Sequence, residues 1–411
     1  MKRIVCLLCC AVALFAGDTV RPGLEGLEDS AITTEEAALL ESLRSPFLSG
    51  MDVAVPLQAW FDGHLAVRQG RPQEAVRLWR EALPACRSCR PLPPVQWGEW
   101  PDAVFTMLEG LRIPEHPDVA CRIVRWDVSN LKQYGVLLYP KAETPPDGYP
   151  LVLYCHGAAF GVPGMFLSWL ADLARRGYAI IGPAMRGEPL FQEPLGSHFA
   201  RYRCEGEIEN LDGEVDDCLA MLSAAWKLPL VRKNEFAMVG HSFGAGIGLL
   251  TCARAGAKAK AAVSYDAWLV NPQRYCFDRM RRWANNWLSW EDFCNQPVAD
   301  QLAGLKKRSI VLNAAMLQCP LLMFIGGAYE GSVFHQSHQD LCMALRRLGK
   351  DFRYEVVPEG GHNFVLYTDS KPALLALAQQ TAFLEKHYPP REIAVNPGMP
   401  PPPPPVPEVK P

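Results

Sequence analysis

Short apolar runs alternate with longer amphipathic segments between about residue 118 and residue 390. The apolar runs, bounded by glycine, proline or polar residues, predict strands at 119–128, 134–139, 151–155, 178–182, 235–239, 261–265, 320–325 and 352–357. Apolar residues spaced three or four positions apart predict helices at 165–176, 208–225, 337–348 and 372–387. After a first antiparallel pair, this alternation requires a mostly parallel eight-stranded sheet with helices on both faces.

The chain outside this region follows a different pattern. Residues 57–83 predict a helix–turn–helix after a shorter helix at 33–45. The spacing resembles one tetratricopeptide unit, which cannot bury its apolar face alone, so we expect the pair to pack onto the main domain. We therefore assign 18–117 to a small N-terminal helical region and 118–390 to the main domain. Residues 391–411 form a proline-rich tail, for which polyproline II is the expected conformation.

The segment 269–318, between the sixth and seventh predicted strands, is long for a connection and predicts a cap or lid. Trp283, Trp287 and Trp290 in this segment share one helical face because they are three and four residues apart. They either line a substrate pocket or form the buried face of a cap helix.

The N-terminus has the features of a secretory signal. Lys2 and Arg3 precede an apolar run over 4–15, and Ala16 and Gly17 follow it. The sequence therefore predicts a signal peptide at 1–17 and export, to a periplasm or out of the cell. An uncleaved anchor or a buried segment is the alternative.

Composition further limits the range of functions that the protein could have. The net charge of −3 and the absence of a basic run argue against nucleic acid as a partner. Cys86 and Cys89 are the one close cysteine pair, and a zinc site would need further ligands nearby. They predict a local disulfide or two free thiols. The sequence indicates no metal and no organic cofactor.

The pentapeptide Gly240-His241-Ser242-Phe243-Gly244 fits the pattern G-x-S-x-G. The apolar strand before it and the helix-forming residues after it supply the strand–turn–helix setting of a nucleophile elbow. The pentapeptide follows the fifth predicted strand, which matches the order of an α/β-hydrolase fold. Ser242 is therefore the candidate nucleophile.

A serine nucleophile needs a base and two oxyanion donors. His362, in a glycine-flanked loop after the last strand, is the candidate base. The backbone N–H of Phe243 is one candidate donor. The loop after the third strand supplies the second, for which we choose Ala158, and His156 in that loop is expected to have a structural role.

Two residues compete for the acid that orients the imidazole. Asp266 ends the sixth predicted strand, and Glu330 follows the seventh. Both give the chain order serine, acid, histidine, and strand position alone slightly favours Glu330.

From His156 to Phe364 the chain resembles the plasma-type platelet-activating-factor acetylhydrolases, which are secreted serine esterases, and more distantly the dienelactone hydrolases. The matching motifs are His156-Gly157, the pentapeptide at 240–244, Asp266-Ala267-Trp268 and His362-Asn363-Phe364. The resemblance implies that Asp266 is the acid, with Glu330 as the alternative. It also implies short-acyl or phospholipid-like ester substrates. We expect Trp268 and Trp287 to line the substrate pocket.

Together these features predict an exported serine hydrolase that cleaves small carboxylic esters through an acyl-enzyme. One alternative is a serine peptidase of the prolyl-oligopeptidase-like type, which Arg186-Gly187 after the fourth strand suggests. Another is a non-catalytic binding protein with the same fold. Peripheral contact with lipid, and a partner for the proline-rich tail, are left open.

Overall fold

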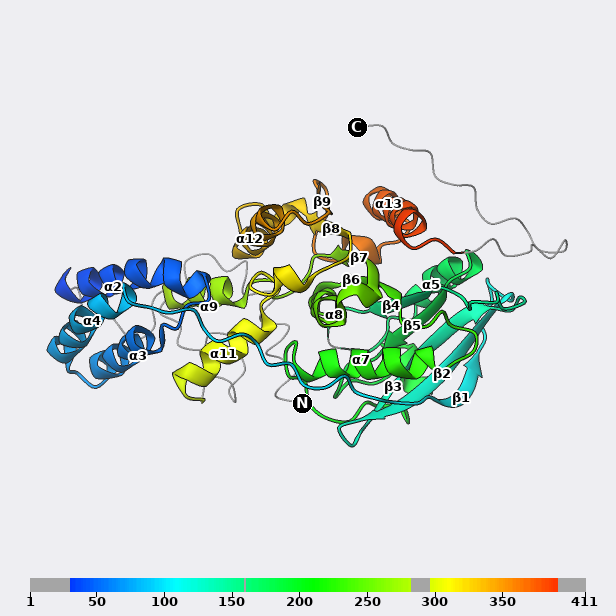
Figure 1. Ribbon diagram of the computed structural model, residues 1–411, viewed down its shortest axis with the longest axis horizontal. Coiled ribbons are helices and arrows are strands. Elements are labelled where there is room, and N and C mark those ends of the chain that lie inside the picture. The colour runs from blue at the N-terminus through cyan, green and yellow to red at the C-terminus, as the bar shows by residue number, and fades with distance from the viewer. Residues whose placement is uncertain (1–29, 159, 282–295, 391–411) are drawn as a thin grey trace. The chain divides into compact units, whose positions relative to one another are not determined.

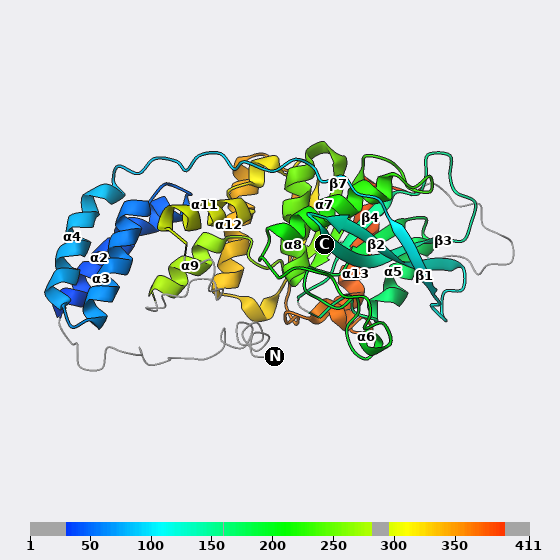
Figure 2. The ribbon, with the colours of Figure 1, turned by 90° about the horizontal axis from the view of Figure 1, so that it is seen from below.

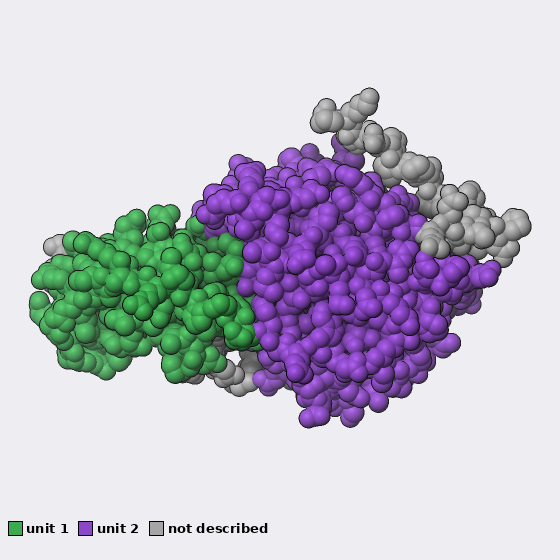
Figure 3. Space-filling view, viewed as in Figure 1, with its two compact units in different colours: residues 1–96, 271–312 green, residues 97–270, 313–411 purple. Residues whose placement is uncertain are grey.

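The computed structural model describes residues 30–158, 160–281 and 296–390 (Figure 1). The predicted signal peptide, the proline-rich tail and the three tryptophans at 283, 287 and 290 lie outside these residues. The chain divides into two compact units (Figure 3). We call residues 1–96 with 271–312 the helical unit, and residues 97–270 with 313–411 the sheet unit.

The sheet unit contains a nine-stranded sheet with the order β1-β2-β3-β5-β4-β6-β7-β8-β9. Its strands are β1 (Thr106–Leu111), β2 (Val119–Val128), β3 (Leu131–Pro140), β4 (Leu151–Cys155), β5 (Ala179–Pro183), β6 (Phe236–His241), β7 (Ala259–Tyr265), β8 (Leu321–Gly326) and β9 (Phe352–Val357). The pairs β1–β2, β2–β3 and β3–β5 are antiparallel, and every other pair is parallel. The mostly parallel sheet expected from the sequence is confirmed.

The sheet has one strand more than the eight expected. The additional strand, β1, lies within the segment 18–117 that the sequence assigned to a helical region. It pairs at the sheet edge with β2, and the register shifts between Met107 and Gly110. None of its residues is buried. An edge strand without a buried face has no apolar alternation, so the sequence pattern did not reveal it.

Helices cover both faces of the sheet (Figures 1 and 2). One face packs against α5 (Phe166–Arg175) and α13 (Lys371–His387), and the other packs against α7 (Gly213–Trp226) and α8 (Ser242–Ala255). The sheet unit also contains α6 (Leu195–His198), α12 (Val333–Arg347) and four short 3₁₀ turns, η1 (Gly256–Lys258), η2 (Ala314–Met316), η3 (Gly327–Tyr329) and η4 (Phe364–Leu366).

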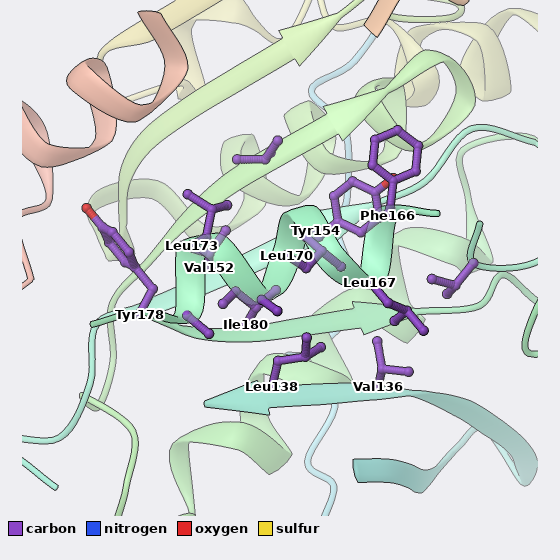
Figure 4. Packing of buried hydrophobic residues seen from close by; sticks show 14 of the residues in the cluster. Val136, Leu138, Val152, Tyr154, Phe166, Leu167, Leu170, Leu173, Tyr178 and Ile180 are labelled. Atoms are coloured by element: carbon purple, nitrogen blue, oxygen red, sulfur yellow. The ribbon is translucent and has the colours of Figure 1, made fainter. Parts of the chain in front are cut away.

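The alternation of side chains along each strand builds the two halves of the core. Val152 and Tyr154 of β4 pack with Leu170 of α5 on one face (Figure 4). The next residue, Cys155, points to the opposite face, where its Sγ lies 3.9 Å from Sγ of Cys218 in α7. Both faces of the central strands are therefore buried, as their unbroken apolar sequences indicate.

Helix α7 begins at Gly213, five residues later than the sequence predicted. The buried carboxylate of Glu214 accepts hydrogen bonds from the backbone N–H groups of Glu209 and Asp212, at 2.6 and 3.2 Å. These bonds hold the preceding residues in a loop, because a side chain near a helix start satisfies N–H groups that the helix leaves free.

The helical unit contains α2 (Ser30–Leu48), α3 (Ala54–Arg68), α4 (Pro72–Cys86), α9 (Pro272–Arg281) and α11 (Val298–Arg308). One apolar cluster joins Leu57, Trp60 and Trp79 of the N-terminal helices to Met280 and Leu305 of the 271–312 segment. The sequence treated that segment as a cap separate from the N-terminal helices. In the structure it supplies apolar surface that a lone helical pair lacks.

Two further expectations concern cysteines and membranes. Cys86 and Cys89 are free thiols, and no disulfide joins two cysteines of the described ranges. No helix in the described part of the chain combines the length and apolar character that a bilayer span requires.

The close contact between α3 and α4 predicts an unusual substitution effect. Replacing a glycine inside a helix by alanine ordinarily stabilises the helix by about 1 kcal/mol. At Gly63 the new Cβ would lie 2.1 Å from Nε1 of Trp79, which donates a hydrogen bond to the carbonyl of Trp60. We expect Gly63→Ala to lower the free energy of unfolding by about 1–3 kcal/mol, because Trp79 must move.

Urea unfolding followed by circular dichroism measures this change. Gly98→Ala is the control, since a Cβ there meets nothing within 4 Å, and its effect should stay within about 0.5 kcal/mol. A stabilised Gly63→Ala protein would contradict the packing.

Candidate active site

Ser242 occupies a strained turn at the junction of β6 and α8. Its φ of 53° is in the left-handed region, which residues with a side chain rarely adopt. The flanking glycines are required by close packing. A Cβ on Gly244 would lie 2.1 Å from the carbonyl oxygen of His156, and one on Gly240 would lie 2.7 Å from Cα of Ala245. This is the geometry of a nucleophile elbow.

The structure brings Ser242 and His362 together. Oγ of Ser242 lies 2.7 Å from Nε2 of His362, which is on the loop between β9 and η4. A neutral imidazole accepts the hydroxyl proton at this distance, and proton transfer to it would make the oxygen nucleophilic.

The surroundings of His362 favour its neutral form. The rings of Tyr329 and Phe334 lie edge-on to the imidazole, each with its centroid 5.8 Å away. Burial, with a smaller contribution from the neighbouring His241 and His338, lowers the pKa of His362 to about 3. The imidazole is therefore ready to accept a proton over a wide pH range.

Asp266 follows the last residue of β7 and is fully buried. Its Oδ1 accepts a hydrogen bond from the backbone N–H of Gly326 at 2.8 Å. Its Oδ2 is buried and has no hydrogen-bond partner among the described residues. Burial raises the pKa of Asp266, which the N–H of Gly326 opposes. Within the described ranges, no hydrogen bond joins Asp266 to His362.

Asp266 and Glu330 differ in their connection to the elbow. The turn that contains Asp266 is bonded to it, since the backbone N–H of Trp268 donates to the carbonyl of Ser242 at 2.8 Å. Glu330 is exposed after η3, and its carboxylate has no ion pair or hydrogen bond with any residue that the structure describes. Neither carboxylate makes a hydrogen bond or an ion pair with His362, and of the two only Asp266 is on a segment that is hydrogen-bonded to Ser242.

The candidate oxyanion donors lie on two segments beside Ser242. Phe243 is in the first turn of α8, where backbone N–H groups have no partner within the helix. Ala158 follows Gly157 in the loop after β4, and a Cβ on Gly157 would lie 3.3 Å from Cβ of Ser242. Both candidate donors are therefore on segments that adjoin Ser242.

A buried carboxyl group supports the loop that contains Ala158. Oε2 of Glu188 accepts a hydrogen bond from the N–H of Gly161 at 3.1 Å and lies 3.4 Å from Nε2 of His156. Nδ1 of His156 is 2.7 Å from the carbonyl of Gly157, to which it donates. Burial raises the pKa of Glu188 to about 8 and lowers that of His156 to about 4. The sequence did not single out Glu188, although it directly follows Arg186-Gly187.

Of the two residues predicted to line the substrate pocket, the structure describes only Trp268. Trp268 is half-buried next to the elbow, and its carbonyl oxygen would lie 2.4 Å from a Cβ on Gly246. Trp287 lies outside the described residues. In the described part of the chain, no group of three or more His, Cys, Asp or Glu side chains is arranged to hold a metal ion.

The fold and the Ser242–His362 pair define a serine hydrolase with the α/β-hydrolase fold, a class that includes esterases and peptidases. Residues 166–390, more than half of the chain, match the sequence model of the prolyl oligopeptidase family. The chain therefore belongs to that family. The matched range contains Ser242, Asp266 and His362. No curated protein sequence matches the chain at a significant level.

Solved structures show the same fold. An acetyl xylan esterase from Paenibacillus sp. R4 is 18% identical, with a TM-score of 0.50, over 72% of this chain and 90% of the esterase. An acylaminoacyl peptidase in complex with Z-Gly-Gly-Phe-chloromethyl ketone is 16% identical, with a TM-score of 0.51, over 68% of this chain. The match covers 43% of that peptidase's length. At these identities the likeness concerns the fold alone.

The lowered pKa of His362 predicts a pH profile. Only the neutral imidazole can accept the serine proton, so reactivity is lost as pH falls through the pKa of His362. Because burial lowers this pKa from 6.5 to about 3, labelling of Ser242 by a fluorophosphonate should remain above half its plateau rate at about pH 5.

The second-order labelling rate measured against pH tests this expectation, with circular dichroism at each pH to verify folding. A half-maximal rate near pH 6.5 or higher would show that a carboxylate already stabilises the charged imidazole in the free protein.

Proposed function

We propose that this protein is a serine carboxylic-ester hydrolase that cleaves small esters through an acyl-enzyme. The observation that supports it most directly is the 2.7 Å contact between Oγ of Ser242 and Nε2 of His362 at a strained elbow. A serine held in a costly backbone conformation against a neutral imidazole has little structural purpose and an evident chemical one.

The proposed reaction has two halves. His362 takes the proton of Ser242 as Oγ attacks the ester carbonyl, and the N–H groups of Phe243 and Ala158 bind the resulting oxyanion. The C–O bond to the alcohol then breaks, and the alcohol leaves with the proton from His362. In the second half, water gives a proton to His362 and attacks the acyl-enzyme, which releases the acid and restores Ser242.

We propose Asp266 as the acid that stabilises the imidazolium. Its buried Oδ2 has no hydrogen-bond partner in the described residues, so it is free to accept from Nδ1 of His362. Its turn is bonded to Ser242 through the N–H of Trp268. The Asp-Ala-Trp motif of the acetylhydrolases that the chain resembles supports the same choice. Glu330, exposed to solvent, is the alternative.

The substrate proposal rests on that resemblance. It favours short-acyl or phospholipid-like esters, with Trp268 beside the acyl group. We further propose that residues 1–17 direct export. We also propose peripheral contact with lipid and a binding partner for the proline-rich tail.

Peptide hydrolysis is the second candidate, and membership of the prolyl oligopeptidase family favours it. The Ser242–His362 chemistry would be the same, with His362 giving its proton to the leaving nitrogen of the amide instead of to the alcohol oxygen. A free peptide amine would also need an acidic anchor, and the sequence has no clear pair of adjacent glutamates near the site residues.

Matched ester and amide substrates test the proposal. We expect p-nitrophenyl acetate to be hydrolysed and p-nitroacetanilide to stay intact over the same period. Ser242→Ala should lower kcat/KM by about 10³-fold or more, because the nucleophile is lost. Ser88→Ala, at an exposed serine, is the control and should retain wild-type activity. Absence of ester turnover together with absence of fluorophosphonate labelling at Ser242 would rule out the enzyme.

Two amide substitutions distinguish the candidate acids. Asp266→Asn keeps an oxygen for the N–H of Gly326, so the fold should persist while the negative charge is lost. We expect kcat to fall by about 10²- to 10⁴-fold. Glu330→Gln should change kcat by less than about twofold, since the side chain is exposed. The reverse order of effects would make Glu330 the acid.

A further inference from the structure

His241, the first of the two variable residues of the pentapeptide, takes no part in the proposed reaction, yet it lies beside both Ser242 and His362. It is buried, and its Nε2 lies 2.9 Å from the backbone carbonyl oxygen of His362. A carbonyl oxygen only accepts hydrogen bonds, so Nε2 carries the proton and donates it. In the neutral imidazole, Nδ1 is then without a proton.

The opposite edge of the same ring lies against the loop after β4. A Cβ on Gly157 would be 2.7 Å from Nδ1 of His241, so a side chain at position 157 would displace the imidazole. One side chain thus touches two loops, the one that carries His362 and the one that carries Ala158. His241 also directly precedes Ser242, whose backbone conformation is strained.

The charge on His241 would affect its neighbour His362. The ring of His241 lies 5.3 Å from the ring of His362, centroid to centroid. A charged His241 would oppose formation of the imidazolium at His362. Burial lowers the pKa of His241 to about 4, so the residue donates a hydrogen bond at neutral pH without adding a charge beside the base.

The hydrogen bond from His241 restrains a loop that has few side chains of its own to hold it. It contains two consecutive glycines, Gly360 and Gly361, and a Cβ on Gly361 would meet nothing within 4 Å. Neither glycine has a side chain that could anchor the loop, and small displacements of a base from its nucleophile are costly to the reaction.

We propose that His241 is a positioning residue, which holds the backbone of His362 through its neutral Nε2–H and thereby keeps the imidazole of His362 on Ser242. The residue takes no proton from the substrate and touches no reacting atom. This inference rests on the proposed function only in that Ser242 must act as a nucleophile.

Glutamine and methionine provide a matched pair of substitutions. Both are unbranched and similar in length, and only glutamine carries an N–H group where Nε2 of His241 lies. We expect His241→Met to slow fluorophosphonate labelling of Ser242 by about 10- to 100-fold. His241→Gln should recover the rate to within about fivefold of wild type. With p-nitrophenyl acetate the loss should fall on kcat, with KM within about twofold. His198→Met, at an exposed histidine, is the control and should match wild type.

Hydrogen exchange supplies a readout that needs no activity. Amides of a peptide spanning 357–366 should exchange faster in His241→Met than in wild type, and at near wild-type rates in His241→Gln. A labelling rate in His241→Met within about twofold of wild type would overturn the proposal. Equal losses in both variants would also overturn it, because a ring that only fills space is replaced equally badly by either side chain.

The two proposals fail in different ways. If Ser242 is labelled but no ester is hydrolysed, ester hydrolysis is wrong and the comparison of labelling rates still decides the role of His241. If Ser242 is not labelled at all, the exchange of residues 357–366 decides it. Unchanged exchange in His241→Met would then overturn the positioning role.

Discussion

The site depends on one steric constraint, the close approach of backbone segments around Ser242. A Cβ at Gly244 would overlap the carbonyl of His156, one at Gly157 would press on His241, and one at Gly246 would meet the carbonyl of Trp268. These contacts bring the loops after β4 and β7 against the start of α8, so the strained φ of Ser242 is enforced from several sides. Any side chain larger than hydrogen at these positions would push the loops after β4 and β7 away from Ser242.

Burial is the second feature that determines the properties of the site, because it favours the neutral form of each ionisable side chain. His156, His241, His338 and His362 all have lowered pKa values, chiefly through loss of solvent. Asp266 and Glu188 have raised ones for the same reason. Neutral imidazoles can donate from one nitrogen and accept at the other, so the site holds several polar contacts without unpaired charge. Oδ2 of Asp266 is buried and has no hydrogen-bond partner among the described residues.

Much of the fold could be predicted from residue patterns. The eight predicted strands and the elbow at Ser242 are confirmed, because fully buried strands and a G-x-S-x-G turn have strong local signals. Edge strand β1 and the later start of α7 could not be predicted in this way. The first has no buried face, and the second depends on a hydrogen bond that the carboxylate of Glu214 accepts from the N–H of Glu209 in the preceding loop. Similarly, the shared core of α3 with α11 joins segments more than two hundred residues apart, and no local pattern encodes it.

The sequence by itself determined the residue types of the site: a serine between glycines, a histidine in a glycine-rich loop and two candidate carboxylates. Their chemistry follows from residue type and from their place at strand ends. Tertiary structure alone decided how they meet. It set the 2.7 Å contact of Ser242 with His362, buried Asp266 and left Glu330 in solvent. It also placed His241 between two loops. The physical reason is that distance and burial arise from the packing of distant segments, whereas residue type is local.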